Sequence, residues 1–251
     1  MFNKSIGLQV LVLVLSLGAG SAVASTWTYG STGPANMDGL SASAAGISAS
    51  NALTATISAS TAYYGGGLGI TSTGESTNPP HHAIDNNGAI ESMLITFSDG
   101  VAGSSYTEKV NLSSVSFGWV SGDSDFSVYA YTGAGVGNPI GLTYSNLTSN
   151  GWTLIGNFNG GNTGSTLTSY NITNSYYSSY WLVGAYNGVS GSLDTSDDYF
   201  KLASVTGTAC TSSTKPGCGG VTPPTSVPEP GTLLLISGGL LGLHRYSRRR
   251  A

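Results

Sequence analysis

The sequence predicts an all-β protein, built as a single β-sandwich or jelly-roll-like domain. Short runs rich in β-branched and aromatic residues alternate apolar and polar positions, and Gly, Asn, Asp or Ser bound them. No stretch between residues 25 and 226 combines a 3.6-residue period with helix caps. The charge is low, while 14 Tyr, 6 Phe and 4 Trp residues are enough to fill a core, so the composition favours a folded chain over a disordered one.

A secretory signal peptide is predicted over residues 1–24. Lys4 supplies the positive charge, LQVLVLVLSLGAG is a short apolar core, and Ala22 and Ala24 form a small-x-small cleavage site. An uncleaved anchor helix is the alternative. We favour cleavage by signal peptidase after Ala24, because the apolar run is short and ends in small residues.

The predicted β-domain covers residues 25–218. Residues 25–62 are rich in Ala and Ser and predict one irregular strand, with weak alternation over 53–59, and residues 62–82 predict a loop region with one short strand. The later strand signals are sharper, and they are ESMLITFS, SSVSFGWV, DFSVYAYT, GWTLIGNF, YWLVGAYNG and DYFKLASVTG. Their alternation predicts Trp119 in the core, and it places Tyr129 and Tyr131 on a more exposed face.

The charge and the cysteine content of the chain are typical of an exported protein. Between residues 25 and 226, eleven acidic side chains accompany only Lys109, Lys201 and Lys215, which gives a net charge of −8. Such a surface repels phosphate backbones and argues against nucleic-acid binding. Cys210 and Cys218 are predicted to form a local disulfide in an oxidising compartment; a metal pair is the weaker alternative, because no histidine lies nearby.

The aspartates form two dense groups, which we interpret as solvated turn residues without a cofactor; a Ca²⁺ site is the alternative. Calcium takes six to eight oxygen ligands, and carboxylates on loops supply them. Neither group fits the EF-hand loop pattern. The residues concerned are Asp123, Asp125, Asp194, Asp197 and Asp198.

His81 and His82 precede Asp85 in NPPHHAIDNNG. One of these histidines with Asp85 would make a metal ligand or a general base. The alternative, which we favour, is a Pro-punctuated loop followed by a turn at residues 85–88. No G-x-S-x-G supports a nucleophilic serine.

Sugar binding and sugar hydrolysis are two further alternatives. Trp119, Trp152, Trp181 and NSYYSSYW are candidates to hold sugar rings, although the same rings also build cores. The A-x-D-N-x-G pattern is loosely similar to discoidin-type and galactose-binding jelly rolls, which is an analogy of fold alone. A glycosidase needs two opposed carboxylates, and the sequence selects no pair. We therefore predict that the domain is not an enzyme.

The C-terminus has three parts after a Gly/Pro/Thr linker at residues 219–227. Pro228, Glu229 and Pro230 come first, and the uncharged run 231–244 follows. At ~1.5 Å per residue this run reaches about 21 Å, short of the ~30 Å hydrocarbon core, so it predicts a short and marginal membrane-spanning helix. The basic residues that orient it, with the domain outside, are Arg245, Arg248, Arg249 and Arg250.

This arrangement over residues 228–251 resembles the PEP-CTERM sorting signal of Gram-negative bacteria. The resemblance implies recognition by the membrane transpeptidase exosortase, cleavage near Pro228–Pro230, and release or attachment at the cell surface, in association with exopolysaccharide and biofilm. The stretches HHAIDNNGAIESMLITF, GWVSGDSDFSVYAYTG and YWLVGAYNG also resemble a group of exosortase-dependent surface proteins, from which no activity is transferred.

Together these features predict an exported, non-enzymatic surface or matrix protein with a structural or adhesive role. It passes through the inner membrane as an intermediate before it reaches the surface. The alternatives are a carbohydrate-binding module, with or without calcium, that takes exopolysaccharide as its partner, and a polysaccharide hydrolase.

Overall fold

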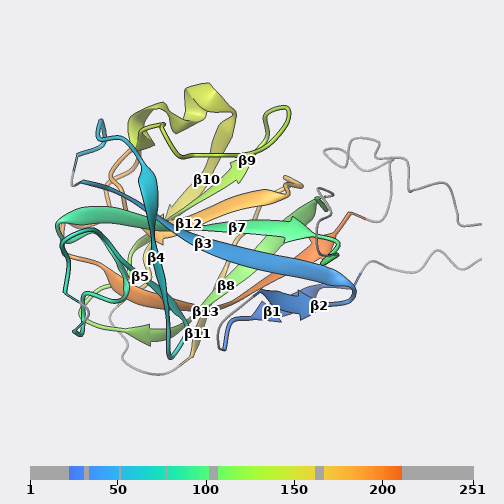
Figure 1. Ribbon diagram of the computed structural model, residues 1–251, viewed down its shortest axis with the longest axis horizontal. Coiled ribbons are helices and arrows are strands. Elements are labelled where there is room, and N and C mark those ends of the chain that lie inside the picture. Colours follow the sequence, from blue (N-terminus) through green and yellow to red (C-terminus); the bar gives the residue numbers. More distant parts are fainter. Residues whose placement is uncertain are drawn as a thin grey trace, which may run out of the picture.

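The described part of the protein is built from antiparallel β-strands and one short 3-10 helix, as the computed structural model shows (Figure 1). The structure describes residues 23–30, 34–50, 52–76, 78–101, 107–161 and 167–210. Its elements are β1 (Ser25–Thr28), β2 (Ala35–Met37), β3 (Leu40–Ser50), β4 (Ser58–Tyr64), β5 (Leu68–Thr71), β6 (Ile84–Asp85), β7 (Ala89–Ser98), β8 (Val110–Val120), β9 (Phe126–Tyr131), η1 (Tyr144–Asn150), β10 (Trp152–Phe158), β11 (Thr168–Asn171), β12 (Tyr180–Ala185) and β13 (Tyr199–Ala209). The predicted all-β class is confirmed.

The strands form one continuous, curled sheet. Its order is β10-β9-β12-β7-β3-β4-β5-β13-β8-β11, with β1 and β6 paired to β13 and β2 paired to β3. Strand β4 joins the two halves, because it pairs with β3 on one side and with β5 on the other. Figure 1 shows the half that holds β3, β7 and β12 lying across the half that holds β8 and β13.

The main core lies between the two halves. Strand β7 buries Met93, Ile95 and Phe97, the face that the sequence predicts, and β8 and β13 supply Phe117 and Phe200 from the other side. The rings of Phe117 and Phe200 stack with their centroids 4.0 Å apart. Alternation along each strand therefore gives each half one apolar inner face.

Trp119 does not belong to this core, so that prediction is wrong. The register between β8 and β13 shifts next to Trp119, where Lys201 pairs with Trp119 and Leu202 with Phe117. An extra residue on β8 interrupts the alternation, and Val120 takes the next buried position. The half-buried Trp119 ring instead stacks on the His82 imidazole, 6.3 Å away between centroids.

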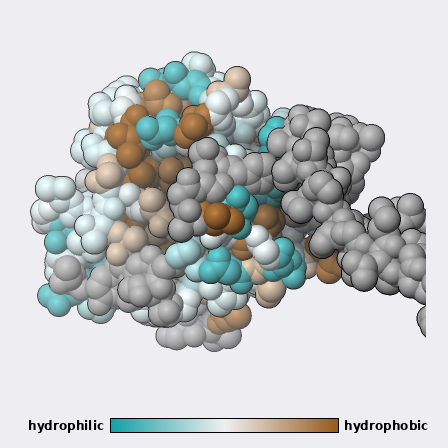
Figure 2. Space-filling model, turned by 45° about the vertical axis from the view of Figure 1, so that its right-hand side comes forward, coloured by the Kyte–Doolittle hydropathy of each residue, from teal (hydrophilic) through white to brown (hydrophobic). Residues whose placement is uncertain are grey.

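Tyr129 is also buried, contrary to the prediction, because a second core covers the outer face of β9 and β12. Helix η1 contributes Tyr144 and Leu147 to this core, and its members from the sheet include Tyr129 and Leu182. Strand β12 is consequently buried along its whole length. Figure 2 shows apolar atoms gathered in the upper part of the molecular surface, the part where Figure 1 draws β9, β10 and η1.

Both ends of the domain lie on one pair of strands. Strand β1 begins at Ser25, directly after the predicted cleavage position, and Ser25 pairs with Gly207 near the end of β13. Cys210 follows β13 and is disulfide-bonded; Cys218 lies outside the described residues. The predicted linker 219–227, the tail 228–251, and residues 1–22 of the predicted signal peptide, Ala22 included, also lie outside them. Within the part that the structure describes, no helix is long and apolar enough to cross a membrane.

Candidate metal centre

Three of the candidate calcium ligands converge where two loops meet. Asp123 and Asp125 lie between β8 and β9, and Asp198 directly precedes β13. One carboxylate oxygen from each lies within 4.8 Å of the others. The backbone holds the loops together, because Asp123 bridges Asp198 in parallel and the Tyr199 amide donates to the Asp123 carbonyl oxygen at 2.8 Å.

Hydrogen bonds from neighbouring groups orient the carboxylates. The Asp125 amide donates to Asp198 Oδ1 at 2.6 Å, and Asn86 Nδ2 donates to Asp198 Oδ2 at 2.6 Å. The Gly160 amide donates to Asp125 Oδ1 at 3.1 Å. Asp125 is 1% exposed, and its second oxygen, Oδ2, accepts no hydrogen bond from the described residues. A buried carboxylate oxygen therefore remains for a ligand of the cluster.

Because the cluster is buried, it is energetically unfavourable for its carboxylates to stay negatively charged. Burial, together with the negative charges of Asp125 and Asp123, raises the pKa of Asp198 to about 8. Burial likewise raises the pKa of Asp125 and that of Asp123. The two lysines of the described residues are engaged elsewhere: Lys109 lines a separate cleft, and Lys201 Nζ donates to the Gly65 carbonyl oxygen at 2.7 Å. A bound cation would supply the missing positive charge.

The other two predicted aspartates lie at the edge of the cluster. Asp194 shares a hydrogen bond with Asp123, and the Ser196 amide, at 2.8 Å, lowers the pKa of Asp194. Asp197 accepts a hydrogen bond from Asn87 Nδ2 at 2.6 Å. Asp123, Asp194 and Asp197 line a cleft of about 420 Å³. The donor set is entirely oxygen, which is the set that suits Ca²⁺.

Asn86 is the positioning residue that the sequence did not reveal. In IDNNG it has the signature of a turn, and the predicted turn is present, since the Asn87 amide donates to Asp85 Oδ1 at 3.0 Å. Asn86 bonds to Asp198 twice, through its Nδ2 and through the Asp198 amide at 2.8 Å. These two residues are brought together only because β6 pairs with β13.

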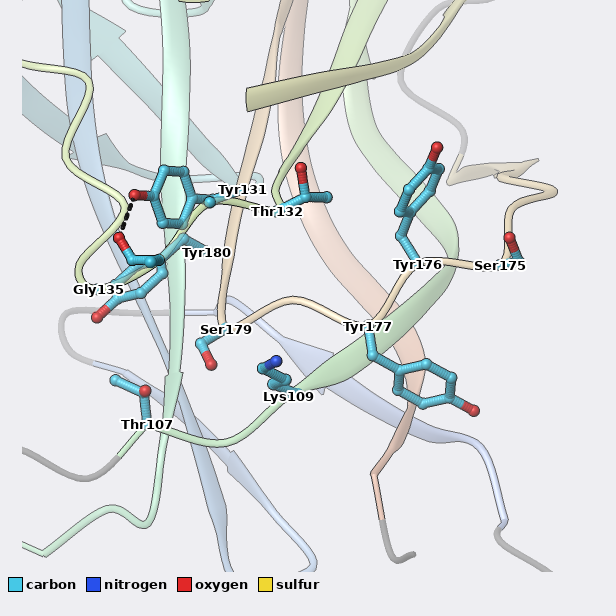
Figure 3. A pocket seen from close by; sticks show the side chains of 12 residues that line it. Thr107, Lys109, Tyr131, Thr132, Gly135, Ser175, Tyr176, Tyr177, Ser179 and Tyr180 are labelled. Carbon is cyan, nitrogen blue, oxygen red and sulfur yellow. Dashed lines mark hydrogen bonds between the residues drawn. The ribbon is translucent and has the colours of Figure 1, made fainter. Parts of the chain in front are cut away.

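A second candidate site is a tyrosine-lined cleft of about 660 Å³. Figure 3 shows Tyr131 and Tyr180 on one side, Tyr176 and Tyr177 on the other, and Lys109 between them. Three of these rings come from the predicted segment NSYYSSYW, whereas Trp152 and Trp181 are buried in the cores. The predicted exposure of Tyr131 is met in part, since its half-buried ring lines the cleft and packs on Trp152. Aromatic rings beside hydroxyl groups suit a sugar.

Comparison with known proteins identifies the C-terminus. Residues 226–250 match the PEP-CTERM protein-sorting motif, which includes the predicted Pro228, Glu229 and Pro230 and the four arginines. No curated protein and no solved structure matches the chain. The motif implies export, processing by exosortase and association with the cell surface. The chain therefore carries a PEP-CTERM sorting motif at residues 226–250.

Proposed function

We propose that the protein is a non-enzymatic component of the surface or extracellular matrix of a Gram-negative bacterium. The observation that carries this proposal is the match of residues 226–250 to the sorting motif. The β-domain would act as a structural or adhesive unit associated with exopolysaccharide or biofilm. Two curled halves around one aromatic core, a sandwich-like arrangement, give a rigid body suited to that role.

The sorting signal would act only in transit. Residues 231–244 hold the protein briefly in the inner membrane, and the four arginines after them keep the C-terminus cytoplasmic. Exosortase then removes the tail near Pro228–Pro230. The mature protein would therefore carry no membrane helix, and the linker 219–227 would connect the domain to its final attachment.

Replacement of Pro228, Glu229 and Pro230 by alanine tests this route in the native host. We expect the tail to stay attached and the protein to accumulate in the inner membrane, as measured by mass spectrometry and cell fractionation. Replacement of Pro223 and Pro224, which lie outside the matched residues, is the matched control and should leave sorting unchanged. Normal tail removal in the triple variant would contradict the proposal.

We propose that the aspartate cluster binds Ca²⁺ and thereby joins the loops of the domain. What supports this is the all-oxygen donor set of Asp123, Asp125 and Asp198, together with the buried Asp125 Oδ2. The surroundings of secreted proteins supply calcium at concentrations that match the weak affinities of extracellular modules, about 10⁻⁴–10⁻³ M. The ion would have a structural role.

A second candidate function is carbohydrate binding in the tyrosine-lined cleft. Tyr176 is 42% exposed, so its ring is available for stacking on a sugar. Polysaccharide pull-down with the purified protein, with and without EDTA, tests it. Tyr176→Ala should weaken binding by roughly 2–10-fold, as expected for the loss of about 0.5–1.5 kcal/mol of stacking, while Tyr176→Phe keeps the ring. Equal binding by both variants would exclude this cleft, and turnover of the polysaccharide would favour a hydrolase.

A further inference from the structure

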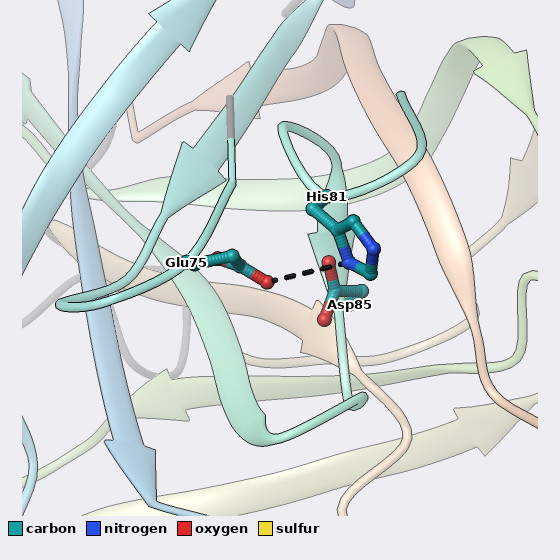
Figure 4. Close-up of side chains that lie close together, drawn as sticks. All are labelled: Glu75, His81 and Asp85. Carbon is teal, nitrogen blue, oxygen red and sulfur yellow. Dashed lines mark ion pairs between the residues drawn. The ribbon is translucent and has the colours of Figure 1, made fainter. Parts of the chain in front are cut away.

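A second cluster of metal-ligating side chains lies outside the aspartate centre. Glu75 and His81 come from the loop between β5 and β6, and Asp85 ends β6. One ligand atom of each lies within 4.8 Å of the others. Figure 4 shows the three side chains pointing toward one another, with His81 Nδ1 3.9 Å from Glu75 Oε1.

The backbone orients both carboxylates and leaves one oxygen of each for a ligand. The Ser72 amide donates to Glu75 Oε2 at 2.8 Å, and the Asn87 amide donates to Asp85 Oδ1 at 3.0 Å. Asp85 is completely buried, and its Oδ2 finds no hydrogen-bond donor among the described residues. An unsatisfied buried carboxylate oxygen is energetically unfavourable, so its retention beside a histidine points to a cation.

A third carboxyl group, that of Glu91, lies buried next to the cluster. This buried side chain accepts a hydrogen bond from the Asp85 amide at 3.2 Å through Oε2, and another from the Ser72 hydroxyl through Oε1. Burial and the nearby Asp85 charge raise the pKa of Glu91 to about 9, while burial and Glu75 raise that of Asp85 to about 8. Hydrogen bonds therefore satisfy Glu91, but they do not account for Asp85 Oδ2.

We propose that Glu75, His81 and Asp85 bind a divalent transition-metal cation of the Zn²⁺ class. The ligand atoms would be Glu75 Oε1, His81 Nδ1 and Asp85 Oδ2. An imidazole nitrogen with two carboxylates is a donor set typical of zinc, whereas Ca²⁺ takes oxygen ligands alone. The cluster and the aspartate centre would therefore hold different metals.

The site is open on one side for entry of the metal. The His81 side chain is 38% exposed and that of Glu75 is 11% exposed. Both line a cleft of about 350 Å³ together with Ser72, Gly74 and Asn87. A metal there would hold the loop between β5 and β6 against the buried end of β6. Its role would therefore be structural.

Calorimetric titration of the untagged full-length protein with Zn²⁺, after treatment with EDTA and dialysis, tests the proposal. We expect one Zn²⁺ bound that a tenfold excess of Ca²⁺ does not displace. His81→Ala and Asp85→Asn should each weaken this binding at least tenfold, and Co²⁺ in place of Zn²⁺ should show a visible absorption band that His81→Ala removes. His81→Ala changes a partly exposed side chain, so circular dichroism should show an unchanged fold.

Two controls distinguish this cluster from other zinc-binding groups. His82→Ala removes the neighbouring histidine, and Asp123→Asn alters the aspartate centre at a side chain that does not bond to Asn86; both should keep the Zn²⁺ affinity. If His81→Ala bound Zn²⁺ as tightly as the unaltered protein, or if no Zn²⁺ were retained, the cluster would be an ion pair of His81 and Glu75 only and the proposal would be wrong. Loss of zinc binding only in Asp123→Asn would assign the metal to the other centre.

Discussion

Asp125→Asn should have opposite effects on the stability of the protein with and without calcium. The side chain is buried beside Asp123 and Asp198, so removing its charge relieves repulsion in calcium-free protein. The substitution keeps the bond from the Gly160 amide to Oδ1 and places an NH₂ group where Oδ2 accepts no bond. With EDTA present, we therefore expect Asp125→Asn to melt at the same temperature as the unaltered protein or higher.

Calcium should reverse this order. For a dissociation constant of about 10⁻⁴–10⁻³ M, 10 mM Ca²⁺ stabilises the native state by about 1.4–2.7 kcal/mol. For a domain of this size that free energy raises the melting temperature by about 3–10 °C. Asp125→Asn should lose most of this gain, because it removes a charged oxygen ligand.

Thermal unfolding by differential scanning calorimetry, in EDTA and in 10 mM Ca²⁺, measures both effects. Asp38→Asn is the matched control: Asp38 has φ 51°, a conformation that Asn adopts readily, and it lies on the turn between β2 and β3, outside the cluster. This control should respond to calcium as the unaltered protein does. The reasoning is refuted if calcium shifts the melting temperature of Asp125→Asn as much as that of the unaltered protein, or shifts neither.

Three further predictions concern the described domain. In EDTA, the free energy of unfolding should fall as pH rises from about 5 to about 8. Folded Asp85 and Asp198, with a pKa of about 8 each, hold protons that the unfolded chain releases near the ordinary aspartate pKa of 3.8. A higher urea midpoint at pH 8 than at pH 5 would contradict this. Tyr144→Phe should cost about 1–3 kcal/mol in urea unfolding, because buried Ser92 loses its partner 2.8 Å away. Gly184→Ala should lower the free energy of unfolding by about 1–3 kcal/mol or more, because its Cβ would lie 1.9 Å from Ser92 Oγ. The control Gly30→Ala places its Cβ where no atom lies within 4 Å, so its melting temperature should be nearly unchanged.

Local pattern sufficed for strands whose side chains alternate between core and solvent. Met93, Ile95 and Phe97 of β7 are buried as their spacing predicts. The apolar–polar alternation placed a strand wrongly at residues 53–59, which form a turn followed by the start of β4. The strand that the structure has in this region, β3, precedes them at Leu40–Ser50. Apart from Leu40 and Ile47, strand β3 consists of small residues, and a neighbour approaches it closely at Gly46, where a Cβ would lie 3.2 Å from the Ser60 carbonyl oxygen. Small side chains carry little periodic signal.

Long-range packing determines the burial of residues for which the local sequence pattern gives the wrong answer. The bulge beside Trp119 depends on the register between β8 and β13, which are more than 70 residues apart. Tyr129 is buried only because η1 packs over its strand, and Asn187 Nδ2 donates to its hydroxyl at 2.9 Å. The aspartates could be predicted as candidates because they lie close together in the sequence, at 123–125 and at 194–198. Their convergence required the bridge between Asp123 and Asp198.

The short segment from Asp85 to Asn87 links the two candidate metal sites. The Asp85 side chain belongs to the cluster with His81, whereas those of Asn86 and Asn87 bond to Asp198 and Asp197. Strand β6 also pairs Asp85 with Tyr199, the residue that follows Asp198. A cation at either cluster would therefore restrain backbone that positions the other, and such a restraint would act equally in both directions. A domain with eleven acidic side chains and two described lysines has few cations of its own, so metals from its surroundings are the natural means of holding these loops together.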